Sequence, residues 1–142
     1  MAGTQQFCTF HLDRFLFGVE VLRVQEVIRS QEMTPVPLAP PVIRGLINLR
    51  GQIVTAIDLR RCLELSDRPA GKKPMNVVLR TDDGPVSLLV DEIGEVVEVS
   101  DERLEEPPAT LRGASRELIR GAYQLDDRLL LVLDADRTVN IV

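Results

Sequence analysis

Hydrophobic and polar residues alternate in short runs along much of the chain, which is the pattern of half-buried β-strands. The first run extends from Gln5 to Leu12 and resumes from Phe15 to Val19 after the polar pair Asp13-Arg14, so it predicts a β-hairpin. Between Val21 and Ile28 the apolar spacing lengthens to three and four residues, and a bent strand or a helical turn is expected there. The pattern therefore indicates a mainly β chain.

The middle of the chain combines a proline-rich segment with a second hairpin. Residues 35–41 carry four prolines and predict an extended connector. Aliphatic and β-branched residues at 46–49 and 52–57 surround Arg50-Gly51, which is typical of two antiparallel strands around a tight turn. Asp58 is expected to cap a short amphipathic helix from Leu59 to Leu65, with Arg60, Arg61 and Glu64 on its polar side.

The second part of the chain continues as β structure after a polar, breaker-rich linker at 67–74. A bend is expected at Gly94, and the last strand is expected to be buried on both faces. The predicted strands are Val77–Leu79, Val86–Val90, Val96–Val99 and Leu129–Leu133.

One stretch of sequence occurs twice, since residues 42–61 match residues 118–137 without a gap. Two small β units that would be only marginally stable by themselves can share one hydrophobic core. The duplication therefore predicts approximate repeat halves 6–66 and 75–138. Matching positions in the two copies are interpreted as scaffold, for turns or for capping. These positions are Gly45 with Gly121, Asp58 with Asp134, and Gly51 with Asp127.

Arg50 departs from this repeat, because the second copy has Asp126 in its place. A turn does not require arginine, so two interpretations stay open. In the first, Arg50 is a solvated charge at a hairpin tip that contributes little to stability. In the second, its guanidinium fork binds a carboxylate or backbone carbonyls of a partner.

Charge and cysteine content exclude several classes of function. The chain has 22 acidic and 17 basic residues, a net charge of −5, and no Lys/Arg cluster longer than a pair, which argues against nucleic-acid binding. Its N-terminus lacks the features of a signal peptide, and no apolar run is long enough to insert directly into a membrane. With only two cysteines, Cys8 and Cys62, a cytoplasmic location is expected.

No catalytic residues, metal ligands or cofactor-binding motif are predicted. His11 has no nucleophile or orienting carboxylate in a recognisable motif around it, and the two cysteines have no CxxC spacing. Neither phosphate-binding glycine motif occurs. The acidic residues from Asp91 to Glu106 alternate with apolar ones and are interpreted as the solvated face of a half-buried strand.

Three segments together resemble the CheW family of chemosensory coupling proteins: "VLRVQEVI", "IRGLINLRGQIVTAIDLR" and "LLVDEIGEVVEV". The resemblance covers residues 6–138 as one CheW-like domain. It implies a mainly β fold of two SH3-like β-barrel subdomains, related by the internal duplication, with short helices.

The resemblance also implies a function, that of a non-enzymatic cytoplasmic adaptor. Its partners would be the regulatory domain of the histidine kinase CheA and the cytoplasmic tip of methyl-accepting chemotaxis receptors. The receptor's helical hairpin would lie in an apolar groove between the subdomains, and the kinase would bind a second edge. The positions that match partner-binding positions of the family are Val24, Glu26, Gly45, Arg50, Ile93 and Val96.

Alternatives to this function remain. A CheW-like coupler can serve a non-flagellar chemosensory pathway, with type IV pili or cyclic-di-GMP as its output. A small β-barrel enzyme is a different class, and two close carboxylates in a shared cleft would favour it. Nucleic-acid binding by an SH3- or OB-like barrel is opposed by the acidic balance and by the lack of exposed aromatic patterning.

Overall fold

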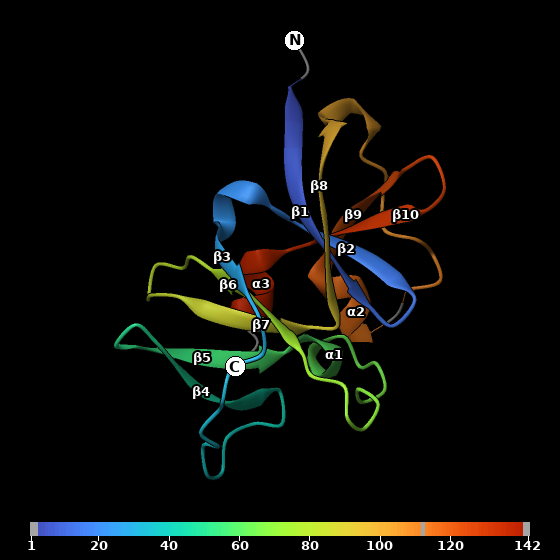
Figure 1. Ribbon diagram of the computed structural model, residues 1–142. Helices are drawn as coiled ribbons and strands as arrows, with labels where there is room; N and C mark the ends of the chain where they lie inside the picture. The colour runs from blue at the N-terminus through green and yellow to red at the C-terminus, as the bar shows by residue number, and fades with distance from the viewer. Residues whose placement is uncertain (1–2, 112, 141–142) are drawn as a thin grey trace.

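The computed structural model describes residues 3–111 and 113–140, and β-strands dominate it (Figure 1). In these residues the strands form two five-stranded sheets, sheet A in the order β8-β1-β2-β10-β9 and sheet B in the order β3-β6-β7-β5-β4. The strands are β1 (Thr4–Leu12), β2 (Phe15–Glu20), β3 (Val24–Ile28), β4 (Ile43–Leu49), β5 (Gln52–Asp58), β6 (Met75–Leu79), β7 (Val86–Val90), β8 (Glu92–Ser100), β9 (Ile119–Gln124) and β10 (Leu129–Leu133).

Short helices connect and flank the strands, and Figure 1 shows α1, α2 and α3 near the junction of the two sheets. Two 3₁₀ turns follow β2 and β8, each at a point where the chain bends. The helices are η1 (Val21–Arg23), α1 (Leu59–Cys62), η2 (Asp101–Arg103), α2 (Gly113–Leu118) and α3 (Ala135–Val139).

The two sheets have the same topology. In sheet A, β1 pairs antiparallel with β2 and β8, while β2 runs parallel to β10, which forms a hairpin with β9. In sheet B, β6 takes the place of β1, β7 of β2, β3 of β8, β5 of β10 and β4 of β9. Each half of the chain therefore supplies five strands in the same order, two to one sheet and three to the other.

Each sheet is closed into a small barrel by the segment that follows one of its edge strands. Thr34, after β3, exchanges two backbone hydrogen bonds of 2.9 Å with Leu46 on β4, at the opposite edge of sheet B. Glu105, after β8, does the same with Ala122 on β9, at 2.8 and 2.9 Å. The predicted fold class of two SH3-like barrels with short helices is confirmed.

The hydrophobic core has three parts. The largest joins the two barrels and includes Phe10 and Phe17 of sheet A together with Ile57 and Leu88 of sheet B. A second cluster fills barrel B around Ile47, and a third fills barrel A around β2, β9 and β10. Alternate residues of β10 contribute to the shared core and to barrel A, so the prediction that this strand is buried on both faces is confirmed.

Most local predictions match the structure. The first hairpin is present, the segment from Val21 to Ile28 contains both a helical turn and a strand, and 35–41 contains no strand. The bend expected at Gly94 is a β-bulge, because the register between β1 and β8 shifts between Cys8 and Phe10. The helix after Asp58 is shorter than predicted, ending at Cys62.

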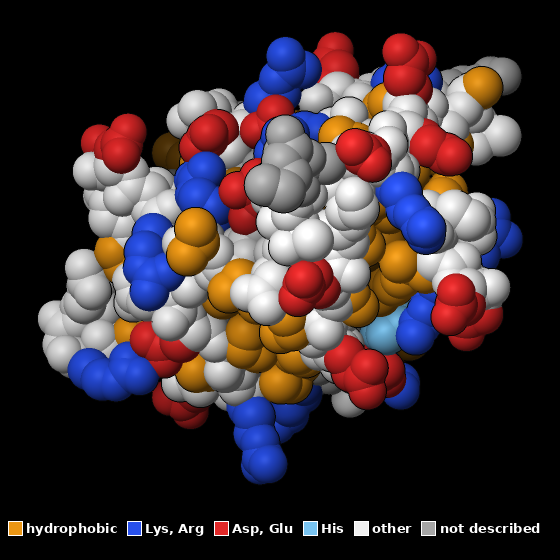
Figure 2. Space-filling model, turned by 90° about the horizontal axis from the view of Figure 1, so that it is seen from above, with side chains coloured by type: hydrophobic (Ala, Val, Ile, Leu, Met, Phe, Trp, Pro, Cys, Tyr) orange, Lys and Arg blue, Asp and Glu red, His pale blue; other side chains and the backbone are white. Residues whose placement is uncertain are grey.

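The surface carries mixed charge. On the face shown in Figure 2, acidic and basic side chains are interspersed around hydrophobic ones and form no continuous basic stripe. Nucleic-acid binding without sequence preference depends on a positively charged groove, so this face offers no support for it.

The exchange of strands between the halves leads to a prediction. A protease site inserted between Ala70 and Gly71, in the linker, should allow clean cleavage without dissociation, because four strand pairings join the two halves: β1 with β8, β2 with β10, β3 with β6 and β5 with β7. Size-exclusion chromatography should show one complex after cleavage. Each half purified alone should be unfolded by circular dichroism, and two independently folded halves would contradict the shared strand order.

Candidate functional site

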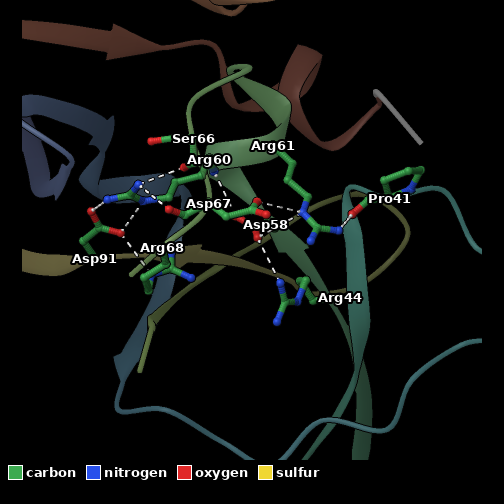
Figure 3. Close-up of polar contacts among 9 residues, drawn as sticks. All are labelled: Pro41, Arg44, Asp58, Arg60, Arg61, Ser66, Asp67, Arg68 and Asp91. Carbon is green, nitrogen blue, oxygen red and sulfur yellow. Dashed lines mark hydrogen bonds and ion pairs between the residues drawn. The ribbon is translucent and has the colours of Figure 1, made fainter. Parts of the chain in front are cut away.

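A largely buried polar cluster in the region that joins the barrels is centred on Asp91, at the point where the chain passes from β7 to β8 (Figure 3). Arg60 of α1 donates two hydrogen bonds to its carboxylate, from Nε at 2.9 Å and from Nη2 at 2.5 Å. Arg68 of the linker donates from Nε at 3.0 Å, and the backbone N–H of Asp13 donates at 2.7 Å. One carboxylate thus ties together α1, the linker and the β1–β2 turn.

This cluster corrects two predictions. Arg60 was expected on the polar side of the helix, but its side chain is only 6% exposed and also donates from Nη1 to the backbone carbonyl of Ser66 at 2.8 Å. Asp91 was assigned to a solvated strand face, but its side chain is only 18% exposed. Helical periodicity treats arginine as polar, and that assumption fails when a buried carboxylate pairs with it.

The surroundings of Asp91 determine its ionisation. Burial alone would raise the pKa of the Asp91 carboxyl, but hydrogen bonds from Arg60 and the Asp13 N–H, the charge of Arg60, and the bond from Arg68 hold it below its ordinary value. Both oxygens of the carboxylate are occupied by these donors. Asp91 therefore has a structural role, and its carboxylate is not available as a catalytic acid or base for the alternative of a small β-barrel enzyme.

A second polar cluster occurs in both copies of the repeat. Asp58 caps α1 by accepting the N–H of Arg60 at 3.1 Å, and Asp134 caps α3 by accepting the N–H of Arg137 at 3.0 Å. Arg61 donates to the carbonyl of Pro41 (Figure 3), and its counterpart Arg137 donates to the carbonyl of Glu117. The scaffold interpretation of the two aspartates is confirmed.

Arg50 and Glu26, both predicted partner-binding residues, contact each other. Arg50 donates from Nη1 to Oε2 of Glu26 at 2.8 Å and from Nη2 to Oε1 at 2.6 Å, so the pair is bidentate. Glu26 lies on the edge strand β3 and Arg50 at the β4–β5 turn, and the contact joins opposite edges of barrel B. The Arg50 side chain remains 71% exposed, whereas that of Glu26 is 19% exposed.

The turn itself does not favour arginine at position 50. Arg50 has φ 51° and Gly51 φ 86°, which is the left-handed region where asparagine or glycine is preferred. Asn48 supports the turn by accepting the N–H of Gly51 at 2.9 Å. The turn geometry therefore does not explain an arginine at this position, whose side chain pairs with Glu26.

The remaining predicted residues separate into different surroundings. Val24 is half-buried on β3, next to the shared core. Gly45 is buried, and a Cβ there would lie 2.7 Å from the carbonyl oxygen of Thr34. Ile93 packs partly against the shared core from β8, while Val96 on the same strand is 59% exposed. The structure thus brings Glu26 and Arg50 together and places Ile93 and Val96 on the other barrel.

Neither cysteine thiol is activated as a nucleophile. Cys62 is buried, and burial raises the pKa of its thiol to about 12, which makes it a poor nucleophile. Burial also raises the pKa of the Cys8 thiol. The described residues contain no cluster of histidine, cysteine and acidic side chains that could hold a metal ion.

Two SH3-like barrels that share a core define the fold class of this chain. Residues 6–142 match the family model of the CheW-like domain, and the chain belongs to this family. It is 31% identical to chemotaxis protein CheW of Treponema pallidum over 91% of this chain and 78% of that protein, and 27% identical to chemotaxis protein CheW of Klebsiella aerogenes over 96% and 82%.

The fold agrees with a solved structure from the same family. The scaffolding protein TtCheW from Thermoanaerobacter tengcongensis superimposes with a TM-score of 0.86, covering 98% of this chain and 94% of that one, at 24% sequence identity. Among the described residues no helix is long and apolar enough to cross a membrane.

The Asp91 cluster leads to a prediction about pH. Asp91→Asn should lower the free energy of unfolding by about 3 kcal/mol at pH 7, because it leaves the buried Arg60 without its counter-charge. A carboxyl with a lowered pKa in the folded state stabilises above the unfolded pKa, and this contribution is lost as the pH falls through the folded value. The difference between wild type and Asp91→Asn should therefore shrink below about pH 4.

Denaturant titrations at several pH values would measure this difference, with the exposed Asp126→Asn as the matched control. Asp126→Asn should stay close to wild type at pH 7. A difference for Asp91→Asn that did not depend on pH would show that the charge of Asp91 is not what stabilises the cluster.

Gly45 and Gly121 occupy equivalent positions of the repeat, and only Gly45 is a predicted partner-binding residue. Comparing substitutions at the two positions therefore separates a packing role of Gly45 from a role in partner binding. A Cβ at Gly121 would lie 2.5 Å from the carbonyl oxygen of Glu105, the counterpart of Thr34. Gly45→Ala and Gly121→Ala should each destabilise the protein by about 1–3 kcal/mol, because a backbone atom cannot easily move away. Thermal unfolding measures both. If Gly45→Ala had wild-type stability, a packing role for Gly45 would be ruled out.

Proposed function

We propose that this protein is a non-enzymatic adaptor that couples methyl-accepting chemotaxis receptors to the histidine kinase CheA in a bacterial chemosensory array. The observation that carries the proposal is the CheW-like domain match over residues 6–142, together with relatives that are chemotaxis proteins. The adaptor works in the cytoplasm, where its partners' signalling domains lie. It acts by holding two proteins in a fixed arrangement rather than by chemistry.

The Arg50–Glu26 pair is the centre of one proposed contact surface. Arginine is enriched at the energetically important positions of interfaces, and an exposed guanidinium already held in one orientation loses little freedom on binding. Ile53, which is 60% exposed, follows the same turn on β5 and adds an apolar contact beside the charge. A carboxylate or carbonyl of the partner would use the guanidinium edge that Glu26 leaves exposed.

Strand β8 is the proposed second surface. It is an edge strand of sheet A, and Val96 presents a large apolar side chain on it. Ile93, on the same strand, is half-buried against the shared core and would support this surface from below, while Val24 is half-buried on β3 of the other sheet. Two partners bound at strand β8 and at the Arg50–Glu26 pair would then engage different barrels.

Charge reversal at Arg50 tests the first surface. Arg50→Glu should weaken binding to the CheA regulatory domain or to a receptor tip fragment by at least about tenfold, with little change in thermal stability, because exposed ion pairs contribute about 0–1 kcal/mol to folding. Isothermal titration calorimetry gives the affinity, and circular dichroism gives the melting temperature.

The exchanged pair Glu26→Arg/Arg50→Glu separates two explanations. It restores an intramolecular ion pair but places the cation on β3, so binding should remain weak if the partner contacts Arg50 directly. Recovery of binding would assign Arg50 to holding barrel B instead. Arg128→Glu, in the β9–β10 hairpin of the other barrel, is the matched control and should bind like wild type.

A further inference from the structure

A cavity of about 300 Å³ lies between the linker, α1 and the β1–β2 turn, which is within the size range of small-ligand sites. The Arg60–Asp91 ion pair forms part of its wall, and Arg68, Lys72 and Lys73 of the linker line another part. Its position next to the junction of the barrels is separate from the Arg50–Glu26 surface.

Two buried hydrogen-bond donors at this cavity lack acceptors. In the described part of the chain, Nη2 of Arg68 and Nδ1 of His11 are buried side-chain nitrogens without a hydrogen-bond partner, and both residues line the cavity. The Arg68 side chain is 10% exposed. Buried polar groups are nearly always hydrogen-bonded, so an acceptor placed in this cavity would be stabilised by both groups.

The chemistry of these two atoms defines what that partner must be. A guanidinium donates only, so Nη2 of Arg68 requires an acceptor. Nε2 of His11 lies 3.3 Å from Nη1 of Arg128, and because a guanidinium only donates, this contact makes Nε2 the acceptor and leaves Nδ1 as the donor nitrogen of the ring. Both nitrogens are therefore donors that require an acceptor, and a group with several acceptor oxygens can accept a hydrogen bond from each of them.

The charges around the cavity also favour an anion. Lys72 and Lys73 are exposed, and neither forms an ion pair among the described residues. Three carboxylates line the cavity as well, namely Asp13, Asp91 and Glu92, but Asp91 is already paired with Arg60 and Arg68. Four cationic side chains face three acidic ones here, in a chain whose net charge is −5.

We propose that this cavity binds an oxyanion group, a phosphate or a carboxylate, through Arg68 and His11, with Lys72 and Lys73 as additional cations. Because Arg68 also donates to Asp91, a bound anion would fix the linker against the cluster that joins the two barrels. The site would thus link anion binding to the order of residues 66–74. This inference does not depend on the identity of the adaptor's partners.

Titration of the intact, ¹⁵N-labelled protein followed by NMR tests the proposal, with chloride keeping the ionic strength constant. Inorganic phosphate is the first probe and succinate the second, so that phosphate and carboxylate recognition are distinguished. The expected result is saturable shifts of the Arg68 side-chain Nε–H and of backbone amides near His11 and in the linker, with at least one of the two anions.

Variants locate the binding. Arg68→Gln should weaken it about tenfold or more, since a charge-assisted hydrogen bond is lost. Arg29→Gln removes the same charge from an exposed position outside the cavity and should leave affinity unchanged. Lys72→Gln/Lys73→Gln changes only exposed linker side chains, so it should weaken binding severalfold without affecting folding, and it keeps the test valid if Arg68→Gln is unstable.

Three results would overturn the proposal. Absence of saturable shifts with both anions would show that the cavity does not bind oxyanions. Equal weakening by Arg29→Gln and the double lysine variant would show a general charge effect. Shifts that map away from His11 and the linker would place the anion elsewhere.

Discussion

The ion pair between Arg60 and Asp91 ties the two barrels together beside the apolar core that they share. Asp91 lies where the chain leaves sheet B for sheet A, and its carboxylate binds α1, the linker and the β1–β2 turn at once. Burying two charges is costly unless they are paired and hydrogen-bonded, and here every oxygen of the carboxylate has donors. The cluster therefore fixes α1, the linker and the β1–β2 turn relative to one another.

The repeat in the sequence explains the architecture but does not correspond to the barrels. Each half supplies two strands to one sheet and three to the other, so both barrels contain strands from both halves. The caps at Asp58 and Asp134 and the close approaches at Gly45 and Gly121 recur because the scaffold recurs. Arg50 and Asp126 differ because the residues at the hairpin tips form neither a helix cap nor a close backbone contact of the scaffold. The hairpin tip of the first copy can therefore carry a side chain suited to binding a partner.

The sequence predicted local structure well and long-range contacts poorly, for a physical reason. Alternation of apolar residues defines a strand, so the hairpins and the doubly buried Leu129–Leu133 were predicted, but alternation does not specify which strand will be the neighbour. The sequence therefore did not predict that each sheet combines strands from both halves of the chain. The roles of Arg60, Arg68 and Asp91 were missed because hydrophobic periodicity assigns charged residues to solvent. The position of Asp91 directly after the buried strand Val86–Val90 was a signal for its role. The Arg50–Glu26 contact joins two residues selected separately by family resemblance, while their binding to partners remains a prediction.

The central claim is that one rigid molecule holds a kinase domain and a receptor at the same time. Sedimentation velocity of the intact protein with the CheA regulatory domain, a receptor tip fragment and both together tests it most directly. The account predicts a ternary complex that sediments faster than either binary complex. If saturating receptor fragment displaced the kinase domain, so that only binary complexes formed, the two proposed surfaces would be one, and the protein would not act as the proposed coupler.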